Sequence, residues 1–271
     1  MSTATLEPAA HLGHRSRPFA WVQQSLTLAW RNIVRIRQNP EALADVTFQP
    51  IIFLALFLFV FGGAIAGGGG WRGNLPTLLP GLLVQTVVFA TMGTGVGLND
   101  DFAKGVFDRF RSLPIARISP LIGAVLGDAV RYTLSIVILM TSGFVLGFRF
   151  DNGVGNGLLG MLIVLLFALS MCWIWVWLGL VMKTAQGVQG IAFLVMFPLT
   201  FGSNIFVPAS TLPDFLQAFV KVSPITYLVN TERALMSGGA LQKPLLITLA
   251  WMVGLVAVFA PLAIRAYRRR T

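Results

Sequence analysis

The sequence predicts an all-α polytopic membrane protein with six transmembrane helices. Hydrophobic residues make up 56% of the 271 residues, charged residues make up only 11%, and the mean hydropathy is +0.78. Soluble proteins carry about 25% charged residues, so this chain is far too apolar for a soluble domain. The apolar residues also form long runs separated by short polar segments. Each run of about 20 residues is long enough to cross a bilayer as a helix.

The N-terminal region contains two segments that we do not expect to cross the membrane. Residues 1–18 are polar and lack the apolar core of a signal peptide, which predicts a disordered cytoplasmic tail. Residues 19–38 are amphipathic, which predicts an elbow helix lying in the headgroup region. A soluble helix packed on a partner would show the same pattern. The apolar stripe of this helix consists of Val22, Leu26, Ala29, Ile33 and Ile36.

Six apolar stretches follow. The first three expected spans are residues 46–65, 77–98 and 119–148, and the last three are residues 158–182, 187–207 and 244–264. On the third span, Asp128 and Arg131 lie one helical turn apart and can form an ion pair. Residues 208–243 are broken by proline and glycine, and we expect short re-entrant helices in the outer leaflet there. Residues 265–271 form a basic cytoplasmic tail.

The distribution of basic residues predicts the orientation in the cell membrane. With six spans both termini lie on one side, and that side carries fourteen Lys and Arg residues against five on the other. Positive residues collect in cytoplasmic segments, so both termini are expected in the cytoplasm. The net charge of +10 reflects basic residues in the cytoplasmic segments, which lie next to anionic lipid. No nucleic-acid partner is therefore expected.

Residues 99–120 form the longest polar interruption between strongly apolar stretches. Phe102, Val106, Phe110 and Leu113 recur with helical spacing, and Pro114 follows them. The pattern predicts a cytoplasmic helix with one apolar face. Such a helix can dock on a partner protein or rest on the membrane surface.

The sequence contains no motif for chemistry of its own. It has no phosphate-binding loop, no His-Glu-x-x-His, no Gly-x-Ser-x-Gly and no chain of intramembrane acids. The single cysteine, Cys172, cannot form an intrachain disulfide or build a metal site alone. These absences favour a permease driven by a separate ATPase. A membrane-embedded enzyme and a non-transporting membrane anchor are the alternatives from other classes.

Two groups of residues resemble the ABC-2 type transporter permeases, and specifically their daunorubicin-resistance branch. The first is the run GVFDRFRSLPIAR at residues 105–117, followed by Gly123 and Asp128. The second comprises FVP at residues 206–208, LP at 212–213, SPITY at 223–227 and RAL at 233–235. The resemblance implies a single transmembrane domain over residues 46–264, with a coupling loop at 99–120 and an outer re-entrant region at 208–243.

The resemblance also implies an assembly of two ATPase subunits with two permeases, the second permease being another copy or a sister chain. ATP and Mg would bind in the ATPase subunits, and no cofactor or metal would bind to this chain. Asp128 and Arg131 would take part in transmission, although a structural ion pair is an equal alternative. The residues implied in ATPase coupling are Phe102, Lys104, Val106, Phe107, Asp108, Arg109, Phe110, Arg111 and Leu113.

In the family the transport path runs between two permeases, along their second and fifth spans. The residues this implies are Gln85, Thr86, Met92, Gln189, Phe193, Met196, Phe197, Phe201 and Asn204. Phenylalanine and methionine side chains with few polar groups suit a hydrophobic or amphipathic drug or antibiotic, which would be exported from the cell. A lipid or glycolipid would suit the same lining.

Overall fold

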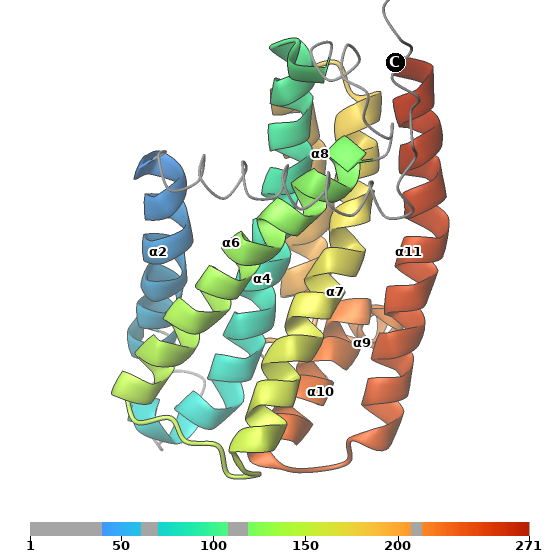
Figure 1. Cartoon of the computed structure of the whole chain (residues 1–271). Helices are drawn as coiled ribbons and strands as arrows, with labels where there is room; N and C mark the ends of the chain where they lie inside the picture. The colour runs from blue at the N-terminus through green and yellow to red at the C-terminus, as the bar shows by residue number, and fades with distance from the viewer. Residues whose placement is uncertain (1–39, 61–69, 108–118, 207–212, 271) are drawn as a thin grey trace, which may run out of the picture.

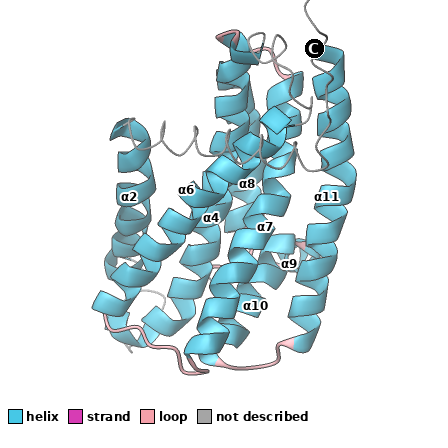
Figure 2. Ribbon diagram, in the orientation of Figure 1, coloured by secondary structure: helices cyan, strands magenta, loops and turns pink. Residues whose placement is uncertain are grey.

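The computed structural model describes residues 40–60, 70–107, 119–206 and 213–270, and every regular element in these ranges is a helix (Figure 1). Figure 2 shows short loops connecting these helices. The expected all-α fold is therefore confirmed for these ranges. In chain order the elements are α2 (Pro40–Ala55), the π-helical η1 (Leu56–Val60), α4 (Gly70–Ala103), α6 (Ser119–Val145), α7 (Val154–Val181), α8 (Ala185–Phe201), α9 (Asp214–Val222), α10 (Pro224–Ser237) and α11 (Gln242–Arg270).

Within the described ranges, four helices are long and apolar enough to cross a membrane. They cover Arg72–Ala103, Pro120–Val145, Val154–Val181 and Gln242–Arg270, and they match the second, third, fourth and sixth expected spans. The first and fifth expected spans correspond to shorter apolar helices, Thr47–Val60 and Ala185–Phe201. The count of six spans therefore stays a prediction. The expected elbow helix at residues 19–38 lies outside the described residues.

Helix α8 is shorter than the span expected at residues 187–207 because local hydrogen bonds end it at Phe201. The backbone N–H of Gly202 donates to the carbonyl of Pro198 at 2.9 Å. Ser203 donates to the carbonyl of Thr200 through both its backbone N–H and its hydroxyl, at 3.2 and 2.6 Å. These bonds satisfy the last carbonyls of the helix and turn the chain away from its axis.

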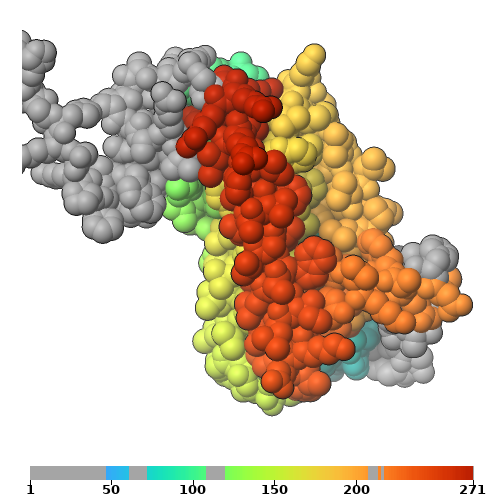
Figure 3. Space-filling view, turned by 90° about the vertical axis from the view of Figure 1, so that its right-hand side faces the viewer, coloured from blue at the N-terminus to red at the C-terminus, as the bar shows by residue number. Residues whose placement is uncertain are grey.

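Helices α4 and α7 form the centre of the bundle. α4 packs against α6, α7, α8 and α10, and α7 also packs along α11. α4 is the most buried of the four long helices and α11 is the least buried. In Figure 3, α11 runs along the whole height of the face turned to the viewer, with α9 and α10 beside its lower half. Any movement of α4 would therefore change its packing against most of the other described helices.

Two glycines allow α4 and α7 to touch backbone to backbone. A Cβ atom on Gly95 would lie 2.4 Å from the carbonyl oxygen of Trp175, and one on Gly179 would lie 2.4 Å from the carbonyl oxygen of Gly95. Such close approach through small residues is common where membrane helices pack. Side-chain hydrogen bonds flank the crossing: the Trp175 indole N–H donates to the Thr91 hydroxyl at 2.9 Å, and the Asn99 amide donates to the Gly179 carbonyl at 2.8 Å.

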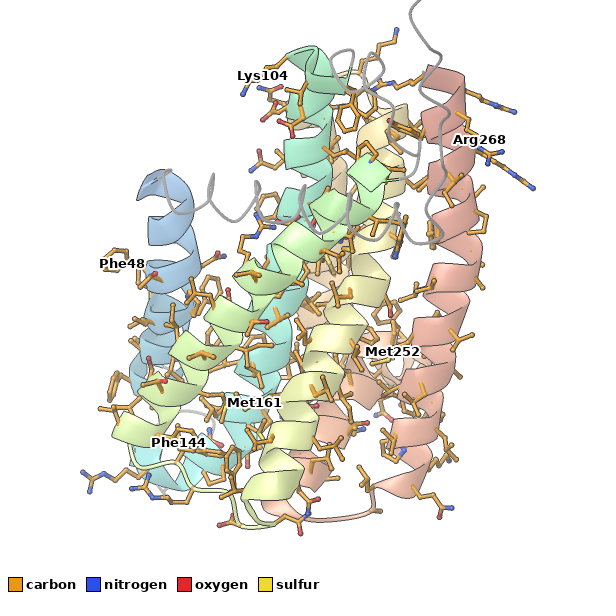
Figure 4. The ribbon with its side chains drawn as sticks, viewed as in Figure 1. Phe48, Lys104, Phe144, Met161, Met252 and Arg268 are labelled. Carbon is orange, nitrogen blue, oxygen red and sulfur yellow. The ribbon has the colours of Figure 1, made fainter. Side chains whose placement is uncertain are left out.

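The two ends of the bundle contain different elements. Lys104, just after α4, and Arg268, in the last turn of α11, lie at the same end, whereas Phe144 lies toward the opposite end (Figure 4). The loop before α7 belongs to the Phe144 end. There the backbone N–H groups of Asp151 and Asn152 donate to the carbonyl of Met236, at the end of α10, at 3.1 and 3.3 Å.

Candidate functional site

A continuous series of aromatic rings runs from α2 and η1 to α8. We call it the aromatic ladder, and it consists of Phe53, Phe57, Phe206, Phe201 and Phe197 in spatial order. Successive ring centroids are 6.0, 4.2, 5.3 and 4.4 Å apart, and all four pairs are stacked. Residues far apart in the sequence therefore form one aromatic stack, in which Phe57 is buried and Phe197 and Phe201 are exposed. Flat aromatic surfaces of this kind favour planar or bulky apolar ligands.

A small, partly open pocket begins at Phe53 of the ladder. Gln85 is fully buried at this pocket, and neither its amide nitrogen nor its amide oxygen has a hydrogen-bond partner. Buried amides are nearly always hydrogen-bonded, so an unpaired one beside a pocket is suited to hold a polar group of a ligand. The pocket is far smaller than the cavities that enclose drug-sized ligands, so it can hold only part of one. Its lining consists of Gln49, Phe53, Gln85, Thr86 and Phe89.

The structure divides the expected transport-path residues into three groups. Gln85 and Thr86 line the pocket, whereas Met92, Met196 and Asn204 are buried in the packing of the chain itself. The Asn204 amide donates to the Asn230 side-chain oxygen of α10 at 2.6 Å. The third group is exposed on α8 and consists of Gln189, Phe193, Phe197 and Phe201. Substrate contact by any of the nine residues stays a prediction.

Sequence reasoning assigned the path to the second and fifth spans and named no residue of α2 or η1, although these helices supply side chains to the pocket and the ladder. Phe53 and Phe57 are four residues apart and stack on each other, and Phe57 also stacks on Phe206. Gln49 lies one turn before Phe53 and also lines the pocket. The signal that could have found them is this i, i+4, i+8 spacing within the first expected span.

The region expected to couple the chain to an ATPase begins at the C-terminal end of α4. Phe102 stacks on Phe107 at 3.9 Å between ring centroids, and both rings meet Tyr267 of α11 edge-on at 5.9 and 5.8 Å. The guanidinium of Arg270 lies 5.6 Å from the centroid of Phe102 and donates to the carbonyl of Met182 at 2.8 Å. These ring contacts and this hydrogen bond therefore hold the C-terminal ends of α4, α7 and α11 against one another.

This arrangement differs from the single amphipathic helix expected over residues 102–113. Phe102 belongs to the last turn of α4, and the chain turns at Lys104 and Gly105 before Val106 begins a new helical turn. The backbone φ of Gly105 is +68°, a conformation that ends a helix and suits glycine. Lys104 is exposed and Val106 is half-buried. The remaining residues expected in ATPase coupling lie outside the described residues, namely Asp108, Arg109, Phe110, Arg111 and Leu113.

Asp128 and Arg131 of α6 form the expected ion pair, with 3.5 Å between the nitrogen and the oxygen. Arg131 also donates to the backbone carbonyl of Ala90 in α4 at 2.7 Å. A Cβ on Gly93 would lie 2.8 Å from both terminal guanidinium nitrogens, so this glycine makes room for the charged group. The next residue on α6, Tyr132, hydrogen-bonds to Thr94 of α4. The pair thus links α6 to α4, and its role in transmission stays a prediction.

These features define an integral membrane protein whose central helices connect a polar end loop to a small, partly open pocket beside a stack of aromatic rings. The comparison with known proteins gives the family. A family model described as "ABC-2 type transporter" matches residues 23–236. The chain therefore belongs to the ABC-2 type transporter family.

Individual relatives agree with this assignment. The chain is 40% identical to the "Daunorubicin resistance ABC transporter permease protein DrrB1" of Streptomyces coeruleorubidus, over 95% of this chain and 90% of the relative. It is 29% identical to the "Doxorubicin resistance ABC transporter permease protein DrrB" of Mycobacterium tuberculosis (strain ATCC 25618 / H37Rv), over 82% and 81%. It is 26% identical to the "Inner membrane transport permease YadH" of Escherichia coli (strain K12), over 68% and 72%. The resemblance to ABC-2 permeases of the drug-resistance branch is confirmed.

Proposed function

We propose that this chain is the permease subunit of an ATP-driven exporter that moves a hydrophobic or amphipathic drug or antibiotic out of the cell. The 40% identity to a daunorubicin resistance permease over 95% of the chain carries the proposal. The aromatic ladder supports it, because stacked rings offer a surface for a planar apolar ligand. Gln85 adds a single polar contact that would orient such a ligand.

The complete substrate site is shared between two permeases in this proposal. The pocket of one chain is too small for a drug-sized molecule. Phe193, Phe197 and Phe201 are exposed on α8, and Phe193 lies 6.3 Å from Phe89 of the pocket. A second copy, or a sister permease, placed against α8 would enlarge the pocket with its own side chains.

Energy reaches the permease from two partner ATPase subunits, which bind ATP and Mg. The loop at residues 99–120 and both chain termini lie in the cytoplasm, where the loop docks on the ATPase. Movement of the loop would pull on Phe102 at the end of α4. Arg131 would pass the movement on to α6, because it is bonded to α4 and to Asp128.

The test is to reconstitute the chain with its ATPase subunit in lipid vesicles and to measure ATP hydrolysis with and without daunorubicin. We expect a severalfold stimulation, and Gln85→Ala should weaken it because the ligand loses its polar contact. Gln242→Ala is the matched control, since Gln242 is an exposed glutamine on α11. Stimulation by an added glycolipid alone would favour the alternative, a lipid exporter. Failure of both substrates to stimulate hydrolysis or to be transported would refute the proposal.

A further inference from the structure

Helix α10 is wedged between three other helices, and three successive side chains point to three different neighbours. The Thr231 hydroxyl lies 3.2 Å from the Thr248 hydroxyl of α11. Arg233 donates to the carbonyls of Thr77 in α4 and Ile205 after α8, at 3.1 and 2.9 Å. Between them, Glu232 faces α7 at Gly160. The contacts of α10 with α4 and α11 are hydrogen-bonded through these side chains.

Unlike the contacts with α4 and α11, the contact of Glu232 with α7 includes no hydrogen bond. Glu232 is completely buried, and neither of its carboxyl oxygens has a hydrogen-bond partner. A Cβ on Gly160 would lie 2.5 Å from one of these oxygens, so the carboxyl group lies directly against the α7 backbone. A buried carboxylate without a partner costs several kcal/mol, whereas the neutral acid costs far less.

No charged group of the surrounding described helices is placed to neutralise a negative charge on the Glu232 carboxyl group. The segment Val154–Val181 of α7 contains no charged residue, and its only titratable side chain is Cys172. The basic and acidic residues of α4, α9 and α11 lie near the ends of these helices, and Arg233 on α10 is directed toward α4. The groups concerned are Arg72, Asp100 and Asp101 on α4, Asp214 and Lys221 on α9, and Lys243, Arg265, Arg268, Arg269 and Arg270 on α11.

We propose that Glu232 is a proton-binding site that keeps α10 closed against α7. With the proton bound, the carboxyl group packs against Gly160. When the proton is lost, the carboxylate must reach water, so α10 separates from α7. The hydrogen bonds from Asp151 and Asn152 to Met236 lie at the end of this contact and act as the pivot.

The pH range follows from the two states of the carboxyl group. α10 is not one of the helices that could cross the membrane. Burial raises the pKa of Glu232 to about 8 in the closed state, whereas a solvated glutamate has a pKa of about 4.3. The closed state therefore holds a proton that the open state releases, and raising the pH favours opening. The opening equilibrium should rise about tenfold per pH unit between the two values and level off outside them.

The experiment is hydrogen–deuterium exchange of the full-length protein in detergent, following peptides from α10 between pH 6 and pH 8. Wild type is compared with Glu232→Gln at each pH, because this comparison cancels the pH dependence of the exchange chemistry. We expect opening of α10 in the wild type to increase about fiftyfold over this range relative to Glu232→Gln, because the tenfold rise per pH unit is already levelling off at the closed-state pKa. Asp214→Asn removes an exposed carboxylate from the neighbouring α9 and should behave as wild type.

Identical pH profiles for wild type and Glu232→Gln would overturn the proposal. If Glu232→Gln does not fold, the infrared band of a protonated carboxyl group is measured in the wild-type protein and in Asp214→Asn. The proposal requires this band at pH 7 in both proteins and its loss above pH 9. Absence of the band at pH 7 would equally overturn it.

Discussion

Replacing Gly95 by alanine tests whether the central helices α4 and α7 depend on backbone contact. The new Cβ would lie 2.4 Å from the carbonyl oxygen of Trp175, whereas ordinary contacts begin at 3.4 Å. The helices must therefore separate locally by about 1 Å. The hydrogen bond from the Trp175 indole to Thr91, now 2.9 Å, would lengthen beyond hydrogen-bonding distance.

The expected loss of stability can be estimated from these contacts. Overpacking costs about 1–3 kcal/mol, and losing the bonds that Trp175 and Asn99 form across the crossing costs about 1 kcal/mol each. Alanine in place of glycine returns about 1 kcal/mol through helix propensity. The net loss is about 2–4 kcal/mol, which corresponds to a fall of roughly 5–15 °C in the unfolding temperature.

The assay is thermal unfolding of the purified full-length protein in detergent, and the chain offers a matched control. Gly97 lies two residues further along α4, and a Cβ there would meet nothing within 4 Å. Gly97→Ala should therefore be neutral or slightly stabilising, whereas Gly179→Ala should match Gly95→Ala. If Gly95→Ala unfolds at the same temperature as Gly97→Ala, the close crossing of α4 and α7 is refuted.

Three further predictions concern coupling and orientation. Arg131→Met removes the bond to Ala90 and the partner of Asp128, so substrate-stimulated ATP hydrolysis should fall severalfold; wild-type stimulation would exclude Arg131 from transmission. Phe110→Ala and Arg109→Ala should each abolish that stimulation while membrane insertion, measured by fractionation, stays intact; normal coupled turnover in both would show that the loop does not dock on the ATPase. A cysteine replacing Asp108 should react with a membrane-impermeant thiol reagent only from the cytoplasmic side, and labelling from outside would reverse the proposed orientation.

The long helices could be predicted from the sequence because each is a single apolar run. The structure places α4, α6, α7 and α11 over the second, third, fourth and sixth expected spans. The shorter helices were harder to predict. The expected span at residues 187–207 runs past Phe201, because apolar residues continue there while the hydrogen bonds of Gly202 and Ser203 already turn the chain. Hydropathy records the residue type and does not record the backbone bonds that end a helix.

The sites were predicted less completely, because they depend on contacts between distant residues. Asp128 and Arg131 are three residues apart, so their pairing is a local property that periodicity reveals. The link from Arg131 to Ala90 spans 41 residues and could not be read from either helix. Glu232 was missed for the same reason. Its sequence neighbours, Thr231 and Arg233, are polar, and only the packing of α10 against α7 shows that the carboxyl group is buried.

If α8 is the fifth expected span, its shortness has a consequence for the surrounding membrane. Its 17 residues rise about 25 Å, less than the roughly 30 Å of the hydrocarbon core. A helix with this hydrophobic mismatch is accommodated by local thinning of the bilayer or by neighbouring protein. Because the exposed phenylalanines of the aromatic ladder lie on α8, lipids would be most strained beside that surface. The acyl-chain length of the host lipids is thus a physical variable that acts directly on the surface where we place the substrate.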